Sequence, residues 1–259
     1  MAELHGGHVV AKYLKEVEEV GAVFSLSGGH FDRIYDGFHE YGVKLIDVRH
    51  EQAAAMMAHA WSIYDGSPGV CLVTAGPGFT NTLTGIVNAY QENAPVVVLS
   101  GTSPIKDRSL GALQEINQVD MVKAAVKWHD ICQDVKRIPQ YLFTAFRQAV
   151  SGRPGPVFLE LPPDILNVTV NEDELMWPRK GSVAPRPGPD PALIQPAADL
   201  INQAERPFII AGSGVGFSKC DEELGQFIGV SGIPFALINA GRGALPDDHP
   251  LSIWEGGLM

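Results

Sequence analysis

Hydrophobic and polar positions along the chain follow two alternating patterns, one typical of buried strands and one of amphipathic helices. Short apolar runs that end in turn residues occupy residues 22–27, 43–48, 69–75, 95–101 and 155–162. Runs of this length and composition predict strands buried on both faces. Helical spacing recurs between them at residues 9–20, 32–41, 52–64, 80–92, 115–126 and 138–151. Strands separated by helices predict an α/β fold with a parallel sheet.

The pattern is interrupted after the last of these strands. Residues 167–191 are rich in proline and polar residues, which predicts a linker between domains. Alternation then resumes with a helix at 192–204, a strand at 207–214, a helix at 220–232 and a strand at 234–240. We therefore expect a parallel-sheet domain over residues 1–166 and a partial second α/β unit over residues 192–259.

Charge and composition narrow the classes of function. The formal net charge of −11 argues against binding to nucleic acid or to an anionic membrane surface. No apolar run approaches the roughly 20 residues of a membrane helix, and no signal peptide is visible at the N-terminus. Cys71, Cys132 and Cys220 are widely spaced, as expected of reduced thiols rather than of a disulfide framework or a zinc site. A cytoplasmic protein without a metal site of its own is the expectation.

Candidate chemistry lies where strands lead into helices. Gly28 and Gly29 follow the first strand and precede His30, so backbone could approach a ligand there, although two glycines alone also suit a tight turn. The segment TAGPGFTN, residues 74–81, resembles a phosphate loop but has no Gly-Lys-Ser/Thr ending. A turn that aims backbone groups at a flat heterocycle fits it better, and a simple strand-to-helix turn is the alternative.

Two further segments contain polar groups that, taken alone, have an ordinary structural explanation. GALQEINQ, residues 111–118, reads as a surface loop when taken alone. Glu51 begins a small-residue helix directly after a strand, where capping and helix-dipole stabilisation are the ordinary explanation for an acidic residue.

Taken together, these segments resemble the pyrimidine-binding domain of thiamine diphosphate enzymes of the acetolactate synthase, 2-hydroxyacyl-CoA lyase and oxalyl-CoA decarboxylase group. The likeness covers about residues 4–166 and is carried by SGGHFD, DVRHEQAAAMMAHA, GVCLVTAGPGFTNTLTGIVNAYQENAPVVVLSG, GALQEINQVDMVK and SGRPGPVFLELPPDIL. The later segments RPFIIAGSGVG and NAGRGALPDDHPLS resemble the first part of the central domain of the same enzymes.

The resemblance assigns roles to individual residues. In that family the glutamate of the RHE motif, here Glu51, hydrogen-bonds N1′ of the cofactor's aminopyrimidine ring and promotes removal of the proton at thiazolium C2. Gly28, Gly29, Pro77, Gly78 and Asn81 are then expected to line the pyrimidine side of the cofactor. Gln114 is expected to reach the substrate end, and His30 to lie over the reacting carbon as a catalytic group.

The resemblance also implies a partner. The Gly-Asp-Gly motif and paired asparagines with which these enzymes hold Mg²⁺ and the diphosphate do not occur in the sequence. We expect a split enzyme, a hetero-oligomer such as a heterotetramer, in which a second subunit binds Mg²⁺ and the diphosphate. A shortened version of a longer chain is the alternative.

Three functions remain open from the sequence. The first choice is a 2-hydroxyacyl-CoA lyase type, which joins or releases a formyl-CoA unit and an aldehyde or ketone. Acetolactate synthase-type condensation of 2-oxo acids is the second. The third is a non-catalytic assembly or regulatory subunit, against which the intact RHEQ segment at Glu51 argues.

Overall fold

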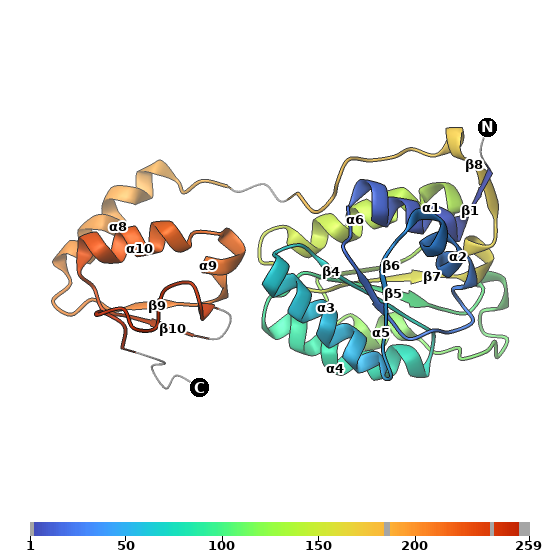
Figure 1. The fold of residues 1–259 in the computed structure, drawn as a ribbon, viewed down its shortest axis with the longest axis horizontal. Helices are drawn as coiled ribbons and strands as arrows, with labels where there is room; N and C mark the ends of the chain where they lie inside the picture. Colours follow the sequence, from blue (N-terminus) through green and yellow to red (C-terminus); the bar gives the residue numbers. More distant parts are fainter. Residues whose placement is uncertain (1–2, 184–186, 239–240, 254–259) are drawn as a thin grey trace. The chain divides into compact units, whose positions relative to one another are not determined.

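The computed structural model describes residues 3–183, 187–238 and 241–253 (Figure 1). The chain divides into two compact units, residues 1–184 and 185–259. Each unit is α/β in character and is described by itself below. None of the helices in the described ranges is long and apolar enough to cross a membrane.

A six-stranded parallel sheet forms the centre of the first unit, which confirms the predicted fold class. In spatial order its strands are β3 (Leu45–Asp47), β2 (Val23–Ser25), β4 (Gly69–Val73), β5 (Val96–Gly101), β7 (Val157–Leu161) and β6 (Trp128–Ile131). The two edge strands, β3 and β6, are only partly buried. The polar sequence of β6, WHDI, explains why the hydrophobic pattern did not predict it.

Helices cover both faces of this sheet (Figure 1). One face carries α1 (Gly6–Lys12), α2 (Asp32–Tyr41) and α6 (Ile138–Val150), and the other carries α3 (Glu51–Asp65), α4 (Pro77–Gln91) and α5 (Gln118–Val122). Successive strand residues point to opposite faces. In β4, accordingly, Val70 and Leu72 pack in one core cluster, whereas Cys71 and Val73 pack in the other. The apolar runs of the sequence reflect this double burial.

Several element bounds differ from those predicted. The first helix starts three residues earlier than expected and continues into a π-helical turn over Tyr13–Val17. Helix α4 begins at Pro77 rather than near Thr80, because proline suits the first turn of a helix. Helix α5 is restricted to five residues, whereas a helix over 115–126 was predicted. Short 3₁₀ turns occupy Ile105–Asp107, Val135–Arg137 and Glu172–Glu174, and a short helix, α7, occupies Pro163–Leu166.

The start of the segment predicted as a linker belongs to the first unit. Strand β8 (Thr169–Asn171) pairs antiparallel with β1 (Glu3–His5), and the side chains of Val170 and Leu175 are buried in the first core cluster. Further along, the Glu18 carboxylate accepts hydrogen bonds from the backbone amides of Gly181 and Ser182 at 2.6 and 3.2 Å. These contacts are long-range in sequence, so a local composition of proline and polar residues does not reveal them.

The second unit contains α8 (Pro191–Gln203), β9 (Ile209–Ala211), α9 (Ser213–Ser218), α10 (Asp221–Ser231) and β10 (Phe235–Leu237). Strands β9 and β10 pair in parallel over a small core that includes Ile228 and Phe235. The strand predicted over 207–214 ends at Ala211, and its last two residues begin α9 instead. Residues 239 and 240 of the last predicted strand lie outside the described residues.

Candidate functional site

The strand order of the first sheet reverses between β2 and β4. From β2 the chain continues to β3 on one side of β2, and it then returns to form β4 on the other side of β2, followed by the later strands. In open α/β sheets, ligands bind in the crevice beyond the carboxyl ends of the strands at such a switch point. His30 follows β2 and Thr74 follows β4, and a hydrogen bond of 2.8 Å joins His30 Nδ1 to Thr74 Oγ1 across this crevice.

Glu51 is the first residue of α3, and three residues separate it from Asp47, the last residue of β3. The preceding His50 caps the helix, since its ring nitrogen accepts the backbone N–H of Gln52 at 3.2 Å. The Glu51 side chain is buried, with 8% of the residue exposed. Asn81 on α4 donates from Nδ2 to Glu51 Oε2 at 3.0 Å. Within the described ranges no hydrogen bond to Glu51 Oε1 is found, so this oxygen is available to a ligand.

Two of the predicted glycines pack closely against the side chain of Thr74, and one of them also approaches Glu51. A Cβ atom on Gly28 would lie 2.4 Å from Thr74 Cβ. A Cβ atom on Gly78 would lie 2.6 Å from Thr74 Cγ2 and 3.3 Å from Glu51 Oε1. Both positions therefore exclude a larger side chain, because the Thr74 side chain already occupies the space that a Cβ atom would need. A Cβ atom on Gly29 would meet nothing within 4 Å, so packing does not require glycine there.

The remaining predicted residues surround the same strand ends. Pro77 opens α4 directly before Gly78. Gln114 has a left-handed backbone with φ of 59°, and a Cβ atom on Gly76 would lie 2.7 Å from the Gln114 carbonyl oxygen. The loop that carries Gln114 is therefore packed against the turn that starts α4. The structure brings Gly28, Glu51, Gly78 and Asn81 together, and it places His30 and Gln114 on neighbouring turns.

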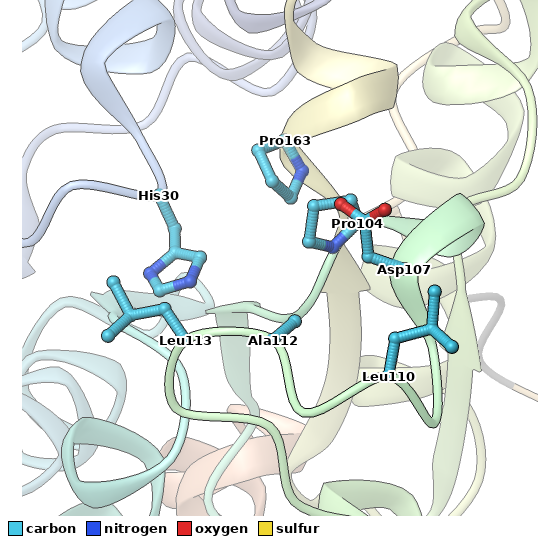
Figure 2. A pocket seen from close by; sticks show the side chains of 7 residues that line it. All are labelled: His30, Pro104, Asp107, Leu110, Ala112, Leu113 and Pro163. Carbon is cyan, nitrogen blue, oxygen red and sulfur yellow. The ribbon is translucent and has the colours of Figure 1, made fainter.

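His30 borders a cavity of about 450 Å³ (Figure 2). The cavity is lined further by Pro104, Asp107, Leu110, Ala112, Leu113 and Pro163. Burial lowers the pKa of His30 from its ordinary value, and a backbone hydrogen bond to Leu113 partly opposes this shift. The ring is therefore neutral at neutral pH and able to accept a proton.

Three polar residues of the site were not among the predicted ones. Thr74 contacts His30, and Gln118 accepts the backbone N–H of Gly76 through Oε1 at 2.9 Å. Glu160 lies in β7 with 2% of the residue exposed and accepts a hydrogen bond from Gln118 Nε2 at 2.9 Å. A glutamate inside the apolar run VFLEL was the available signal, because a buried carboxylate requires polar partners.

Comparison with known proteins identifies the family of this chain. The family profile described as "Thiamine pyrophosphate enzyme, N-terminal TPP binding domain" matches residues 4–121, and "Thiamine pyrophosphate enzyme, central domain" matches residues 194–259. The chain belongs to the thiamine pyrophosphate enzymes. Its first unit has the fold of the pyrimidine-binding domain of this family, and thiamine pyrophosphate (thiamine diphosphate) is the cofactor that the family binds.

Relatives of different activities are similar to nearly the whole chain. A probable acetolactate synthase large subunit of Methanocaldococcus jannaschii is 35% identical over 98% of this chain and 44% of its own length. A 2-hydroxyacyl-CoA lyase of Arabidopsis thaliana is 33% identical over 96% of this chain and 44% of its own length. An oxalyl-CoA decarboxylase of Escherichia coli K12 is 34% identical over 95% and 44%. The chain thus spans less than half the length of these relatives.

Proposed function

We propose that this chain supplies the pyrimidine-binding half of a thiamine diphosphate site, in an enzyme that makes or cleaves a carbon–carbon bond next to a carbonyl group. The observation that carries this proposal is the environment of Glu51. One carboxylate oxygen is held by Asn81, and the other lies close to Gly78, where a Cβ atom would come within 3.3 Å of it. A carboxylate held in this way suits a hydrogen bond to a ring nitrogen of a flat heterocycle.

Thiamine diphosphate, when bound, supplies a nucleophilic carbon that adds to the carbonyl carbon of a substrate. The residues of this chain contribute binding and proton transfer. Glu51 holds the proton at N1′ of the aminopyrimidine, which is general acid–base work of a positioned side chain. Gly28, Pro77, Gly78 and Asn81 bound the ring, and neutral His30 exchanges a proton with the substrate oxygen.

For the substrate, we favour the 2-hydroxyacyl-CoA lyase type. The cavity beside His30 is mostly apolar, and Asp107 is the only acidic group among its seven lining residues. A neutral aldehyde or ketone suits such a cavity, whereas the carboxylate of a 2-oxo acid would be repelled by Asp107. Acetolactate synthase-type condensation remains the second candidate, because relatives of both kinds match the chain equally broadly.

The proposal includes a partner. We propose that a second subunit contributes the diphosphate-binding domain together with its Mg²⁺ ligands, and that the coenzyme A part of the substrate is also held outside the cavity beside His30. The supporting observation is a group of exposed apolar side chains on α3 and α4, the helices that carry Glu51 and Asn81: Met56, Met57, Ile63 and Val87. An apolar surface next to the site favours association with another polypeptide.

A comparison of turnover with two sets of substrates tests the assignment. The chain, co-purified with a polypeptide that carries the Gly-Asp-Gly motif, is supplied with formyl-CoA and a ketone, and separately with pyruvate alone. We expect a 2-hydroxyacyl-CoA product from the first pair and little acetolactate from the second. Faster acetolactate formation would favour the second candidate, and no turnover of either, with Glu51 intact and thiamine diphosphate bound, would favour a non-catalytic subunit. Asp107→Asn should increase the turnover of pyruvate, and Asp199→Asn on α8 serves as its control.

A further inference from the structure

One buried amide connects three strand-end segments of the first unit. Gln118 is 1% exposed and begins α5. Its Nε2 donates to the carbonyl oxygen of Gly101, at the end of β5, and to Glu160 Oε1 in β7, both at 2.9 Å. Its Oε1 accepts the N–H of Gly76, in the turn that follows β4, at 2.9 Å. One side chain thus forms hydrogen bonds with backbone groups at the ends of two neighbouring strands, β4 and β5, and with a buried carboxylate in a third strand, β7.

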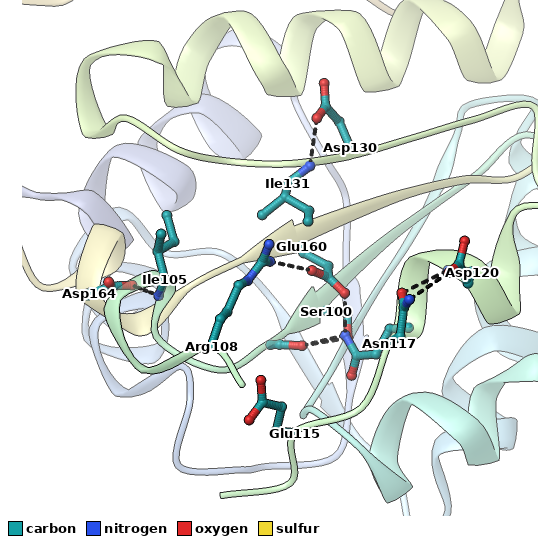
Figure 3. A network of polar contacts seen from close by, with 12 residues as sticks. Ser100, Ile105, Arg108, Glu115, Asn117, Asp120, Asp130, Ile131, Glu160 and Asp164 are labelled. Atoms are coloured by element: carbon teal, nitrogen blue, oxygen red, sulfur yellow. Dashed lines mark hydrogen bonds and ion pairs between the residues drawn. The ribbon is translucent and has the colours of Figure 1, made fainter. Parts of the chain in front are cut away.

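Glu160 fixes which way this amide points. The Glu160 carboxylate also receives Arg108 Nη2 at 3.3 Å on Oε2, and Figure 3 shows Glu160 between Arg108 and Ser100. A carboxylate accepts hydrogen bonds, and so does the carbonyl of Gly101, so the NH₂ group of Gln118 must face both. The carbonyl oxygen of Gln118 is therefore left for the N–H of Gly76. Reversing the amide would oppose donor to donor at Gly76 and acceptor to acceptor at Glu160.

The Gly76 turn leads directly to residues that the proposed function places around the cofactor. Gly76 has a left-handed φ of 59° and lies against the Gln114 backbone. Two residues later, Gly78 borders Glu51 Oε1, and α4 then carries Asn81 to Glu51 Oε2. A change in the path of this turn would move both groups relative to Glu51. The hydrogen bond from Gly76 N–H to Gln118 is one restraint on that path from outside the turn itself.

We propose that Gln118, oriented by Glu160, is a positioning residue that holds the Gly76–Gly78 turn in the conformation required to bind the cofactor's aminopyrimidine ring. The proposal rests on the proposed function for the identity of the ligand, whereas the restraint on the turn is independent of it. Gln118 itself touches no reacting atom in this account. It acts through Gly76 and through the position that Gly78 and Asn81 take beside Glu51.

Two substitutions separate the restraint from bulk stability. Gln118→Glu has the same shape but replaces the NH₂ donor by an oxygen, so two carboxyl groups would oppose one another at residues 118 and 160. Gln118→Met keeps the length and burial without any hydrogen bond, and remains informative if Gln118→Glu does not fold. Gln226→Glu makes the same chemical change at an exposed position of α10 and is the matched control.

The first measurement is amide hydrogen exchange at Gly76 by NMR, in the full chain without cofactor. Both Gln118 variants should exchange at least about tenfold faster than wild type at this amide. In Gln118→Met the amide loses its acceptor, and in Gln118→Glu repulsion from Glu160 and from the Gly101 carbonyl displaces the carboxyl group that would accept it. The double variant Gln118→Glu with Glu160→Gln restores a complementary pair and should regain part of the protection. Unchanged exchange at Gly76 in both single variants would overturn the proposal.

The second measurement is the Kd for thiamine diphosphate of the assembled enzyme. We expect at least about a tenfold increase in Kd for the Gln118 variants, partial rescue in the double variant and no change in Gln226→Glu. Faster exchange at Gly76 with unchanged Kd would show a purely structural restraint and would overturn the positioning role. Failure of the wild-type assembly to bind thiamine diphosphate would instead contradict the proposed function, while exchange at Gly76 would still decide whether Gln118 restrains the turn.

Discussion

At the scale of single residues, Glu51 and His30 are equally buried but have different hydrogen-bond partners. Each is 8% exposed. Glu51 is held by an amide donor from α4, whereas His30 contacts the Thr74 hydroxyl and borders a cavity large enough for a small substrate. This difference fits the proposed roles, in which the carboxylate contacts the cofactor and the imidazole contacts the substrate.

His30→Ala distinguishes a catalytic role from a structural one. If His30 exchanges a proton with substrate, turnover of the assembled enzyme should fall well over tenfold, while the melting temperature and cofactor affinity stay nearly unchanged. If the residue only supports its own turn, the melting temperature should fall and turnover per folded enzyme should hold. His39→Ala, at an exposed position of α2, is the control. Normal turnover in His30→Ala would remove the residue from the catalytic mechanism.

The pH dependence of stability follows from the two buried histidines. Desolvation lowers the pKa of both His30 and His59 in the folded state. As pH falls through the ordinary histidine value of about 6.5, the unfolded chain takes up protons that the folded chain does not, so these residues destabilise the fold at acidic pH. The free energy of unfolding in urea should decrease from pH 7.5 to pH 5.5. This decrease should be smaller in His59→Gln, and an equal decrease in wild type and variant would contradict the assignment.

At the scale of elements, the contact between α3 and α4 holds Glu51 beside Asn81. A Cβ atom on Gly85 of α4 would lie only 2.5 Å from the Ala55 Cβ of α3, so the two helices approach closely at this point. Small residues on both helices make that approach possible. The alanine-rich start of α3, which is unremarkable as a helix sequence, is thereby connected to the geometry of the carboxylate.

Gly85→Ala tests this close contact. Overpacking there should lower the free energy of unfolding by about 1–3 kcal/mol and should weaken cofactor binding, since it separates Glu51 from Asn81. Gly229→Ala in α10 is the matched control, because a Cβ atom there would meet nothing within 4 Å. That change should stabilise its helix by about 0.5–1 kcal/mol. Equal effects of the two substitutions on urea unfolding would show that the helices do not pack as described.

The fully buried strands could be predicted from the sequence, whereas a polar edge strand and two short strands could not. Strands β4, β5 and β7 are buried along their whole length, so each forms a mostly apolar run. The edge strand β6 and the three-residue strands β1 and β8 have no such run, and pairing of distant segments creates them. The loop before α5 is held by Glu115, which accepts the amides of Ser109, Gly111 and Ala112. This contact replaces the helix start predicted at residue 115.

The residues of the candidate site were likewise predicted only in part. The sequence motifs predicted Glu51, Asn81 and Gly78, because these residues occur at fixed places in segments typical of the family. Gln118 and Glu160 lie 42 residues apart and become a pair only when β7 and α5 are assembled. Their roles depend on hydrogen-bond direction, which no local pattern shows.

At the scale of the whole molecule, the proposed cofactor site of the first unit lies next to exposed apolar helix surfaces. Met57 and Val87 are 39% and 45% exposed on α3 and α4. We predict that a partner bearing the diphosphate-binding domain covers this surface in an obligate interface of more than ~2,000 Å². Calorimetry should show thiamine diphosphate binding by a mixture of this chain and the partner. Binding and turnover by this chain alone, at the level of the mixture, would contradict the split arrangement.

Proton exchange at C2 of thiamine diphosphate is the most direct measurement of the central claim, that Glu51 of this chain activates the cofactor. The exchange rate of this proton for deuterium is followed by NMR in the assembled enzyme, with wild type, Glu51→Gln and the exposed control Glu222→Gln. Glutamine keeps the shape and burial of residue 51 but cannot exchange the proton. The account predicts a loss of about 10²–10⁴-fold in Glu51→Gln, with assembly intact and the control unchanged. Exchange in Glu51→Gln as fast as in wild type would show that Glu51 is not the activating residue.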